Sequence, residues 1–188
     1  MLKPKQKLTK FINTDLFKIH LDYLDKHLEG KFPKGVAELR NYTFNTHAKL
    51  EEWMGAAISR GSFKTVEESN LEVNLKGSIM GDVSIQMHRL LTVMEFHSIL
   101  EAFLKNVEDE KLRKELDNKI SAVNRIRNEF AHPYGYFDLT QYSVDSPEGL
   151  QNHNKTLELL CSSLEVMERY LLKYHNDWYK NTKSLKSQ

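Results

Sequence analysis

The chain has 188 residues, of which 40% are apolar and 28% charged, and these ordinary proportions exclude a disordered, collagenous or coiled-coil protein. Its charges nearly cancel overall, but residues 1–10 carry +4 and residues 173–188 carry +3, which leaves −6 for residues 11–172. Affinity for nucleic acid comes largely from basic side chains that neutralise phosphates, so this negative charge excludes a general polyanion binder. Any RNA or DNA must bind at a local basic site or to the tails.

Two helices are predicted in the first third of the chain. The first spans roughly residues 8–28, where apolar side chains recur at helical spacing before a glycine and a proline. The second runs from about residue 36 to residue 59 and is expected to end at Gly61. Residues 62–81 are ambiguous, because their short apolar alternation suits a strand and a surface loop equally well.

Three more helices are predicted in the rest of the chain. One is expected to open at Asp82 as its N-cap and to continue to about Lys105, and the next to run from about Asp109 to Ala131. The last begins at Ser146-Pro147-Glu148, a cap residue followed by proline at the first helical position, and continues to about Tyr174. The predicted fold class is therefore all-α, an up-and-down bundle of about five helices with short connections.

The sequence predicts three regions and a cytoplasmic location. Residues 1–35 form a basic tail and an extra helix, residues 36–175 the helical bundle, and residues 176–188 a basic tail. No apolar block follows the lysine-rich start, so we expect no signal peptide, and no stretch approaches the roughly 20 apolar residues of a membrane span. The only cysteine, Cys161, has no partner for an internal disulfide and lies among leucines, so we expect core packing in a reducing compartment.

The candidate functional residues gather at the end of the fourth predicted helix. At about 100° per residue, Arg127 falls inside the apolar sector of this helix, with Asn124 and Asn128 on one flank. Arg125 and Glu129 are expected to point into water. An arginine directed at its own helix's buried stripe needs a partner, because an unpaired buried charge costs several kcal/mol.

His132 is predicted to lie just beyond the last helical turn. Pro133 disfavours the helical conformation for the residue before it, so the imidazole should sit within about 7–8 Å of Arg127 along the axis. An arginine can hold a phosphate through its planar fork, and a histidine can move protons near neutral pH, so the pair suits an anionic-phosphate site. A structural role fits too, with the arginine bridging neighbouring helices and the histidine capping its own.

The segment Arg127-Asn128-Glu129-Phe130-Ala131-His132 resembles the R-x(4–6)-H signature of the HEPN superfamily, in which asparagine directly after the arginine is common. The likeness extends more weakly over about residues 36–175, with the motif at the foot of a late helix and a closing helix after it. Residues 1–30 and 62–81 would be additions to the minimal bundle. The resemblance implies a HEPN-like helical fold.

Proteins of this superfamily are commonly metal-independent endoribonucleases, often toxins or phage-defence proteins, that work as dimers with their motifs facing across a cleft. The resemblance therefore implies an RNA substrate, a homodimer, and neither metal nor cofactor. It implies that Arg127 and His132 are catalytic and that Asn128 is the polar neighbour that orients the site. The implied reaction is attack of a ribose 2′-hydroxyl on the adjacent phosphodiester, which leaves a cyclic phosphate and a 5′-hydroxyl.

The resemblance carries two further expectations. Tyr134 extends the motif to R-x4-H-x-Y, and in nucleotidyltransferase–HEPN pairs that tyrosine receives AMP from the partner. Tyr134 is thus a candidate for modification or RNA contact, and a nucleotidyltransferase or antitoxin is a candidate partner. The alternative is a non-catalytic interaction or regulatory module, since the HEPN-like mannitol-operon repressor family has a similar size and helical layout and acts through protein contacts.

The other histidines do not suggest a metal site. No two histidines of the chain are four residues apart, the spacing at which a histidine pair on one helix binds a metal. His47 and His97 each lie near an apolar face, and we expect both to be core histidines with satisfied hydrogen bonds.

Overall fold

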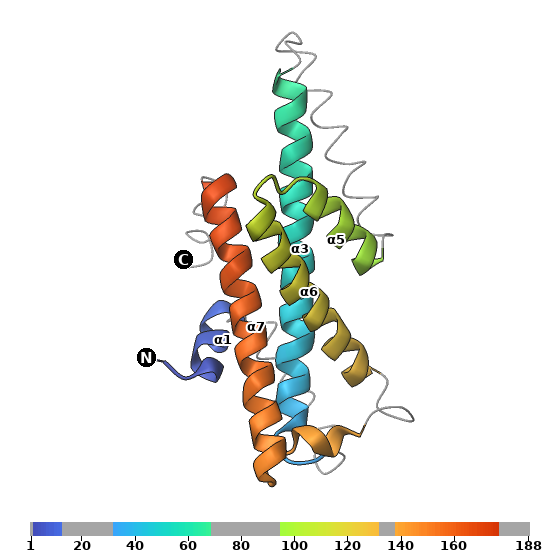
Figure 1. Ribbon diagram of the computed structural model, residues 1–188, viewed down its shortest axis with the longest axis vertical. Helices are drawn as coiled ribbons and strands as arrows, with labels where there is room; N and C mark the ends of the chain where they lie inside the picture. Colours follow the sequence, from blue (N-terminus) through green and yellow to red (C-terminus); the bar gives the residue numbers. More distant parts are fainter. Residues whose placement is uncertain (1, 13–31, 69–94, 132–137, 177–188) are drawn as a thin grey trace. The chain divides into compact units, whose positions relative to one another are not determined.

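The computed structural model describes residues 2–12, 32–68, 95–131 and 138–176 (Figure 1). These ranges contain five α-helices and one short 3-10 helix and no strand, which confirms the predicted all-α class. None of the described helices is long and apolar enough to cross a membrane. The elements are α1 (Pro4–Ile12), α3 (Val36–Glu68), α5 (Phe96–Lys105), α6 (Glu110–Ala131), η1 (Leu139–Tyr142) and α7 (Pro147–Tyr174).

Two helices begin where the sequence predicts, and each start has a side-chain cap. The Asp109 carboxylate accepts a hydrogen bond from the Leu112 amide at 3.0 Å, which satisfies one of the free N–H groups at the start of α6. The Ser146 hydroxyl accepts from the Gly149 amide at 3.0 Å in the same way at the start of α7. α6 is helical through Ala131, and the helix end predicted next to it falls on residues outside the described ranges.

Removing the cap at the start of α7 has a measurable expected cost. Ser146→Ala should lower the unfolding free energy by about 1 kcal/mol, because the Gly149 amide loses its acceptor. Urea denaturation followed by circular dichroism measures this. Ser98→Ala, an exposed serine inside α5, is the matched control and should change little; equal losses in the two variants would contradict the capping role.

Three predicted boundaries are wrong. α1 begins at Pro4 rather than near residue 8, because proline suits the first helical position and the Lys3 amide donates to the Gln6 side chain at 3.2 Å. α3 passes through Gly61 and continues to Glu68, since one glycine costs a helix only about 1 kcal/mol and no proline follows it. The third predicted helix does not run unbroken to Lys105, because the backbone of Glu95 is extended and α5 begins after it, and nothing in the local sequence marks that boundary.

Several expectations fall outside the described residues. These are the remainder of the first predicted helix beyond Ile12, the ambiguous segment from residue 69 onward, the predicted helix start at Asp82, and the tail after residue 176.

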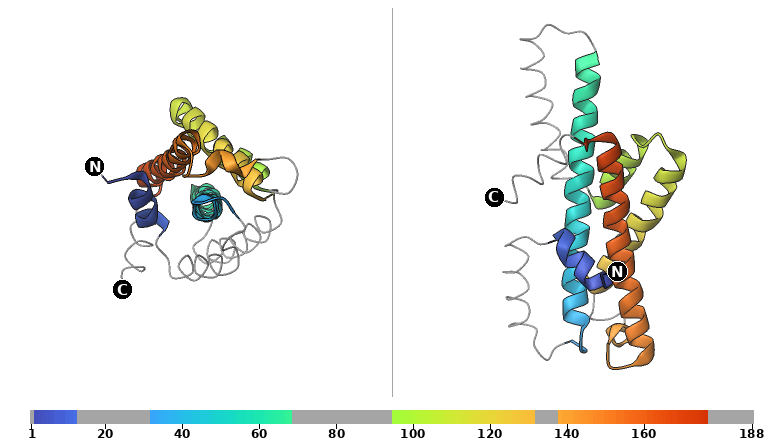
Figure 2. Two further views of the ribbon diagram at one scale, coloured as in Figure 1. Left: turned by 90° about the horizontal axis from the view of Figure 1, so that it is seen from below. Right: turned by 90° about the vertical axis from the view of Figure 1, so that its left-hand side faces the viewer.

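The contacts within the chain define two compact units, and α3, α6 and α7 each contribute to both. Unit 1 consists of residues 1–49 and 118–166. Within it α6 runs in the direction opposite to α3 and α7, and α1 lies beside α7 (Figures 1 and 2). Its core is formed by apolar side chains with little or no exposure: Leu8, Val36, Leu39, Ile120, Val123, Phe130, Leu160, Cys161 and Leu164. The burial of Cys161 confirms its predicted core packing.

The start of α3 in unit 1 is fastened to the segment after η1. The Val144 amide donates to the Lys34 carbonyl at 3.1 Å. Gly35 follows with a φ of +82°, and an added Cβ there would meet the Val144 side chain at 2.8 Å. Only glycine combines this left-handed backbone with such a close approach.

Two lysines of the basic N-terminal segment are paired within unit 1. Lys5 lies 2.7 Å from Glu38 on α3, and Lys7 lies 3.4 Å from Glu165 on α7. Part of the +4 charge of residues 1–10 is therefore offset locally by acidic side chains.

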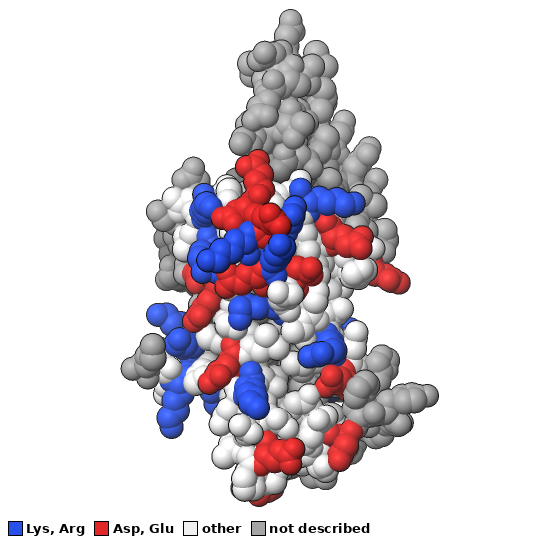
Figure 3. Space-filling view, in the orientation of Figure 1, with Lys and Arg blue, Asp and Glu red and all other residues white. Residues whose placement is uncertain are grey.

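Unit 2 consists of residues 50–117 and 167–188. Its core includes an edge-to-face pair of Phe103 and Tyr170, with ring centroids 5.0 Å apart. Ion pairs join its surface: Lys114–Glu110, Arg169–Glu115 and Lys173–Asp109. Acidic and basic side chains are accordingly intermingled there (Figure 3). His97 is exposed and lies 3.1 Å from Glu101, so its predicted core position is wrong.

Candidate functional site

Arg127, the arginine of the candidate motif, lies four residues before the end of α6 in unit 1. Its side chain is half-buried. The guanidinium carbon lies 5.3 Å from the centre of the Phe44 ring, within the range of a cation–π interaction, and Nη1 donates to Asn128 Oδ1 at 3.0 Å. The partner that its position in the apolar sector requires is thus an aromatic ring, assisted by an exposed amide.

The Arg127 guanidinium is incompletely satisfied. Its Nε–H is buried and has no hydrogen-bond acceptor. Within the part of the chain that the structure describes, no carboxylate forms an ion pair with it. A buried donor without an acceptor costs about 1–3 kcal/mol, so the position of this side chain is not explained by stability alone.

A second arginine, Arg40 on α3, contacts the same ring. Its guanidinium carbon lies 5.0 Å from the centre of Phe44 and 5.6 Å from that of Phe32. Arg40 Nε donates to the Phe130 carbonyl at 3.2 Å. That carbonyl is one of the last four of α6, which lack partners within the helix, so Arg40 caps α6 with a positive charge where the helix dipole favours one.

His47, one helical turn beyond Phe44 on α3, completes this contact between α3 and α6. Its Nε2 lies 3.1 Å from Asn124 Oδ1, an oxygen that only accepts, so Nε2 carries the proton. The pKa of His47 is lowered to about 4, chiefly by burial and to a smaller extent by the nearby Arg127 charge, although the bond to Asn124 opposes the shift. His47 is therefore neutral at pH 7, and its predicted burial is confirmed.

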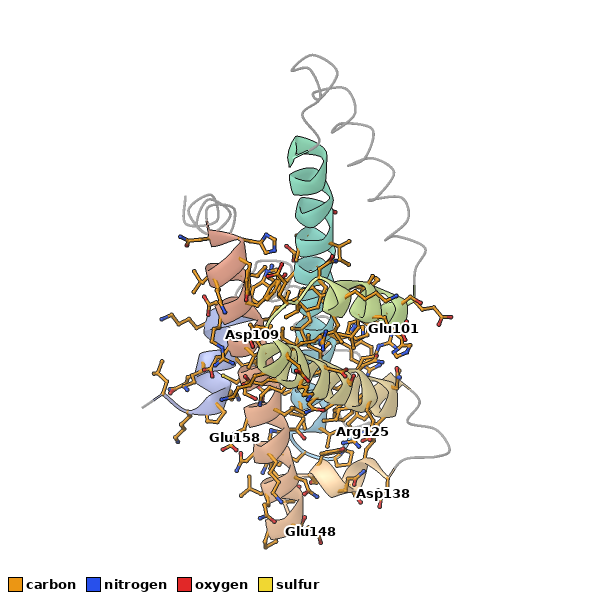
Figure 4. The ribbon with its side chains drawn as sticks, turned by 45° about the horizontal axis from the view of Figure 1, so that its top comes forward. Glu101, Asp109, Arg125, Asp138, Glu148 and Glu158 are labelled. Atoms are coloured by element: carbon orange, nitrogen blue, oxygen red, sulfur yellow. The ribbon has the colours of Figure 1, made fainter. Side chains whose placement is uncertain are left out.

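The last turn of α6 is also joined to η1. The Tyr142 hydroxyl donates to Glu129 Oε2 at 2.7 Å, and the rings of Phe130 and Tyr142 lie 5.2 Å apart. Burial, followed by the hydrogen bond to Glu129, raises the pKa of Tyr142 well above its usual value. Glu129 was expected to point into water, and this bond corrects that expectation, whereas Arg125 is exposed as predicted (Figure 4).

The predicted site residues are only partly described. Arg127 and Asn128 are brought into direct contact, while His132 and Tyr134 lie outside the described residues. Sequence reasoning missed Arg40 and Phe44. Together with His47 they recur at helical spacing on one side of α3, which was the available signal, but spacing alone does not tell which helix that side meets.

The described residues contain no group of three or more His, Cys, Asp or Glu side chains placed to hold a metal ion. Comparisons with protein-family models, curated proteins and solved structures found no match to this chain.

Proposed function

We propose that this chain is a HEPN-type endoribonuclease with a toxin or phage-defence role, acting as a homodimer on RNA. In this proposal Arg127 and His132 of both chains form the catalytic site, and Asn128 orients the Arg127 guanidinium. The 2′-hydroxyl attacks the adjacent phosphorus and loses its proton. The bond from phosphorus to the 5′-oxygen breaks, and that oxygen takes up a proton, so the products are a 2′,3′-cyclic phosphate and a 5′-hydroxyl.

The main structural support for this proposal is the environment of the Arg127 side chain. Its guanidinium is half-buried against Phe44 and held by Asn128, with no carboxylate ion pair among the described residues. A guanidinium whose charge is not neutralised by the protein can stabilise the negative charge that develops on the phosphoryl oxygens during attack. Because Arg127 is held in place beforehand, little reorganisation is needed when the substrate arrives.

His132 supplies the proton transfer in this scheme. An imidazole titrates near neutral pH, so one histidine can accept the 2′-hydroxyl proton and another can protonate the leaving oxygen. Two such groups are required, and a dimer in which each chain contributes one motif provides them. Tyr134, two residues further on, is then positioned in the sequence to contact RNA or to receive AMP from a nucleotidyltransferase or antitoxin partner.

Analysis of the RNA ends tests the proposal. Wild-type protein incubated with total RNA in EDTA should give fragments with 5′-hydroxyl ends, which polynucleotide kinase labels without prior phosphatase treatment. The blank is the double variant Arg127→Ala/His132→Ala, checked for folding by circular dichroism. Fragments bearing 5′-phosphates, cleavage that stops in EDTA, or no fragments above the blank would overturn the nuclease proposal, and the last result would favour the non-catalytic regulatory module.

A further inference from the structure

The cluster formed by Arg40, Phe44 and Arg127 concentrates positive charge in unit 1. Both guanidinium carbons lie within 5.3 Å of the centre of one ring, so they are no more than about 10 Å apart. His47, next to them, is neutral at pH 7 and adds no charge. This basic spot lies in a body, residues 11–172, whose net charge is −6.

Each guanidinium in the cluster is oriented by a different contact. Arg40 Nε is fixed on the Phe130 carbonyl, and Arg127 Nη1 is fixed on Asn128. A guanidinium carries five N–H donors in a planar fork, so it can hold such a partner and a phosphate at the same time. The upper limit of about 10 Å between the two guanidinium carbons allows two consecutive phosphates of a single RNA strand to contact one group each.

We propose that Arg40 is a substrate-binding residue that contacts the phosphate adjacent to the one held by Arg127, so that the cluster grips two consecutive phosphates of single-stranded RNA. The identity of the strand rests on the proposed nuclease function, whereas the two-phosphate grip rests on the geometry of the cluster. Arg40 takes no part in proton transfer. Its loss should weaken RNA binding, which is measured with a probe that cannot be cleaved.

The salt dependence of RNA binding measures how many phosphates the protein contacts. Each phosphate neutralised on a single strand contributes about 0.7 to the slope of log affinity against log salt. Arg40→Gln removes the charge but keeps an amide that can donate to the Phe130 carbonyl, so the slope should fall by about 0.7. Arg40→Lys keeps the charge and should retain the wild-type slope.

The probe is a short fluorescein-labelled oligonucleotide of mixed sequence whose sugars are all 2′-O-methylated, so that it cannot be cleaved. Fluorescence anisotropy over a series of NaCl concentrations gives the slope for each protein. Arg125→Gln is the matched control, because Arg125 is exposed on the same helix about 200° around the axis from Arg127. Arg40→Met, which keeps an apolar stem, is the second charge-free variant and serves if glutamine impairs folding.

The outcomes separate this inference from the nuclease proposal. A slope lowered in Arg40→Gln but not in Arg40→Lys or Arg125→Gln supports the two-phosphate grip, even if wild-type protein cleaves no RNA. Equal slopes for Arg40→Gln and wild type overturn it, even if wild-type protein cleaves RNA. An equal fall in Arg125→Gln, or no binding of the probe by wild type, also overturns it.

Discussion

Replacing Arg127 with methionine should slow RNA cleavage by about 10²–10³-fold, the loss typical of removing one donor that stabilises charge in the transition state. The same change should not weaken the fold. We expect the unfolding free energy to rise by about 1 kcal/mol, because the substitution removes a buried Nε–H that has no acceptor. Methionine retains a flexible apolar stem that can pack on Phe44.

Single-turnover cleavage assays and urea denaturation of the same preparations measure the two effects. The matched control is Arg125→Met, which removes the same charge from the exposed side of α6 and should leave both quantities nearly unchanged. A fall in stability without a fall in cleavage would mean that Arg127 is a structural residue. A fall in cleavage that tracks the loss of folded protein would mean the same.

Acid should destabilise the protein by about 2–3 kcal/mol between about pH 6.5 and pH 4 through His47 alone, after allowing for its partial exposure. The folded-state pKa of about 4 lies below the ordinary value of 6.5. Below pH 6.5 the unfolded chain therefore binds a proton that the folded chain rejects. The stabilising contribution is complete above pH 6.5 and is lost as the pH falls toward 4.

Urea denaturation at a series of pH values checks this expectation. In His47→Gln, which can still hydrogen-bond Asn124, the fall in unfolding free energy over that range should be smaller by the His47 contribution. Burial also lowers the pKa of His153, and that contribution persists in both proteins. Parallel pH profiles for wild type and His47→Gln would show that His47 titrates normally in the folded state.

Local sequence signals predicted those helix boundaries that depend on capping chemistry. Asp109 and Ser146 each place an oxygen where a helix start needs an acceptor. The helix end predicted at Gly61 is wrong, because a single glycine weakens a helix without ending it. The start of α5 after the extended Glu95 has no local signal, so it could not be predicted from the neighbouring residues.

The candidate site was predictable on one helix but not across two. The position of Arg127 around α6 followed from the helical repeat, and so did the need for a partner. The identity of the partner, Phe44, could not be predicted. The helical repeat determines which side chains share a face of one helix, but not which faces of two helices pack together. The same limit explains why the bond between Tyr142 and Glu129 was missed.

The use of one ring by two cations has a consequence for how variants of this protein combine. Removing either Arg40 or Arg127 relieves the other of a like charge and leaves it the sole occupant of Phe44. Residues in contact through a shared neighbour are energetically coupled, commonly by about 0.5–3 kcal/mol. The two arginines therefore form one thermodynamic unit, and the effect of replacing both cannot be obtained by adding the effects of replacing each.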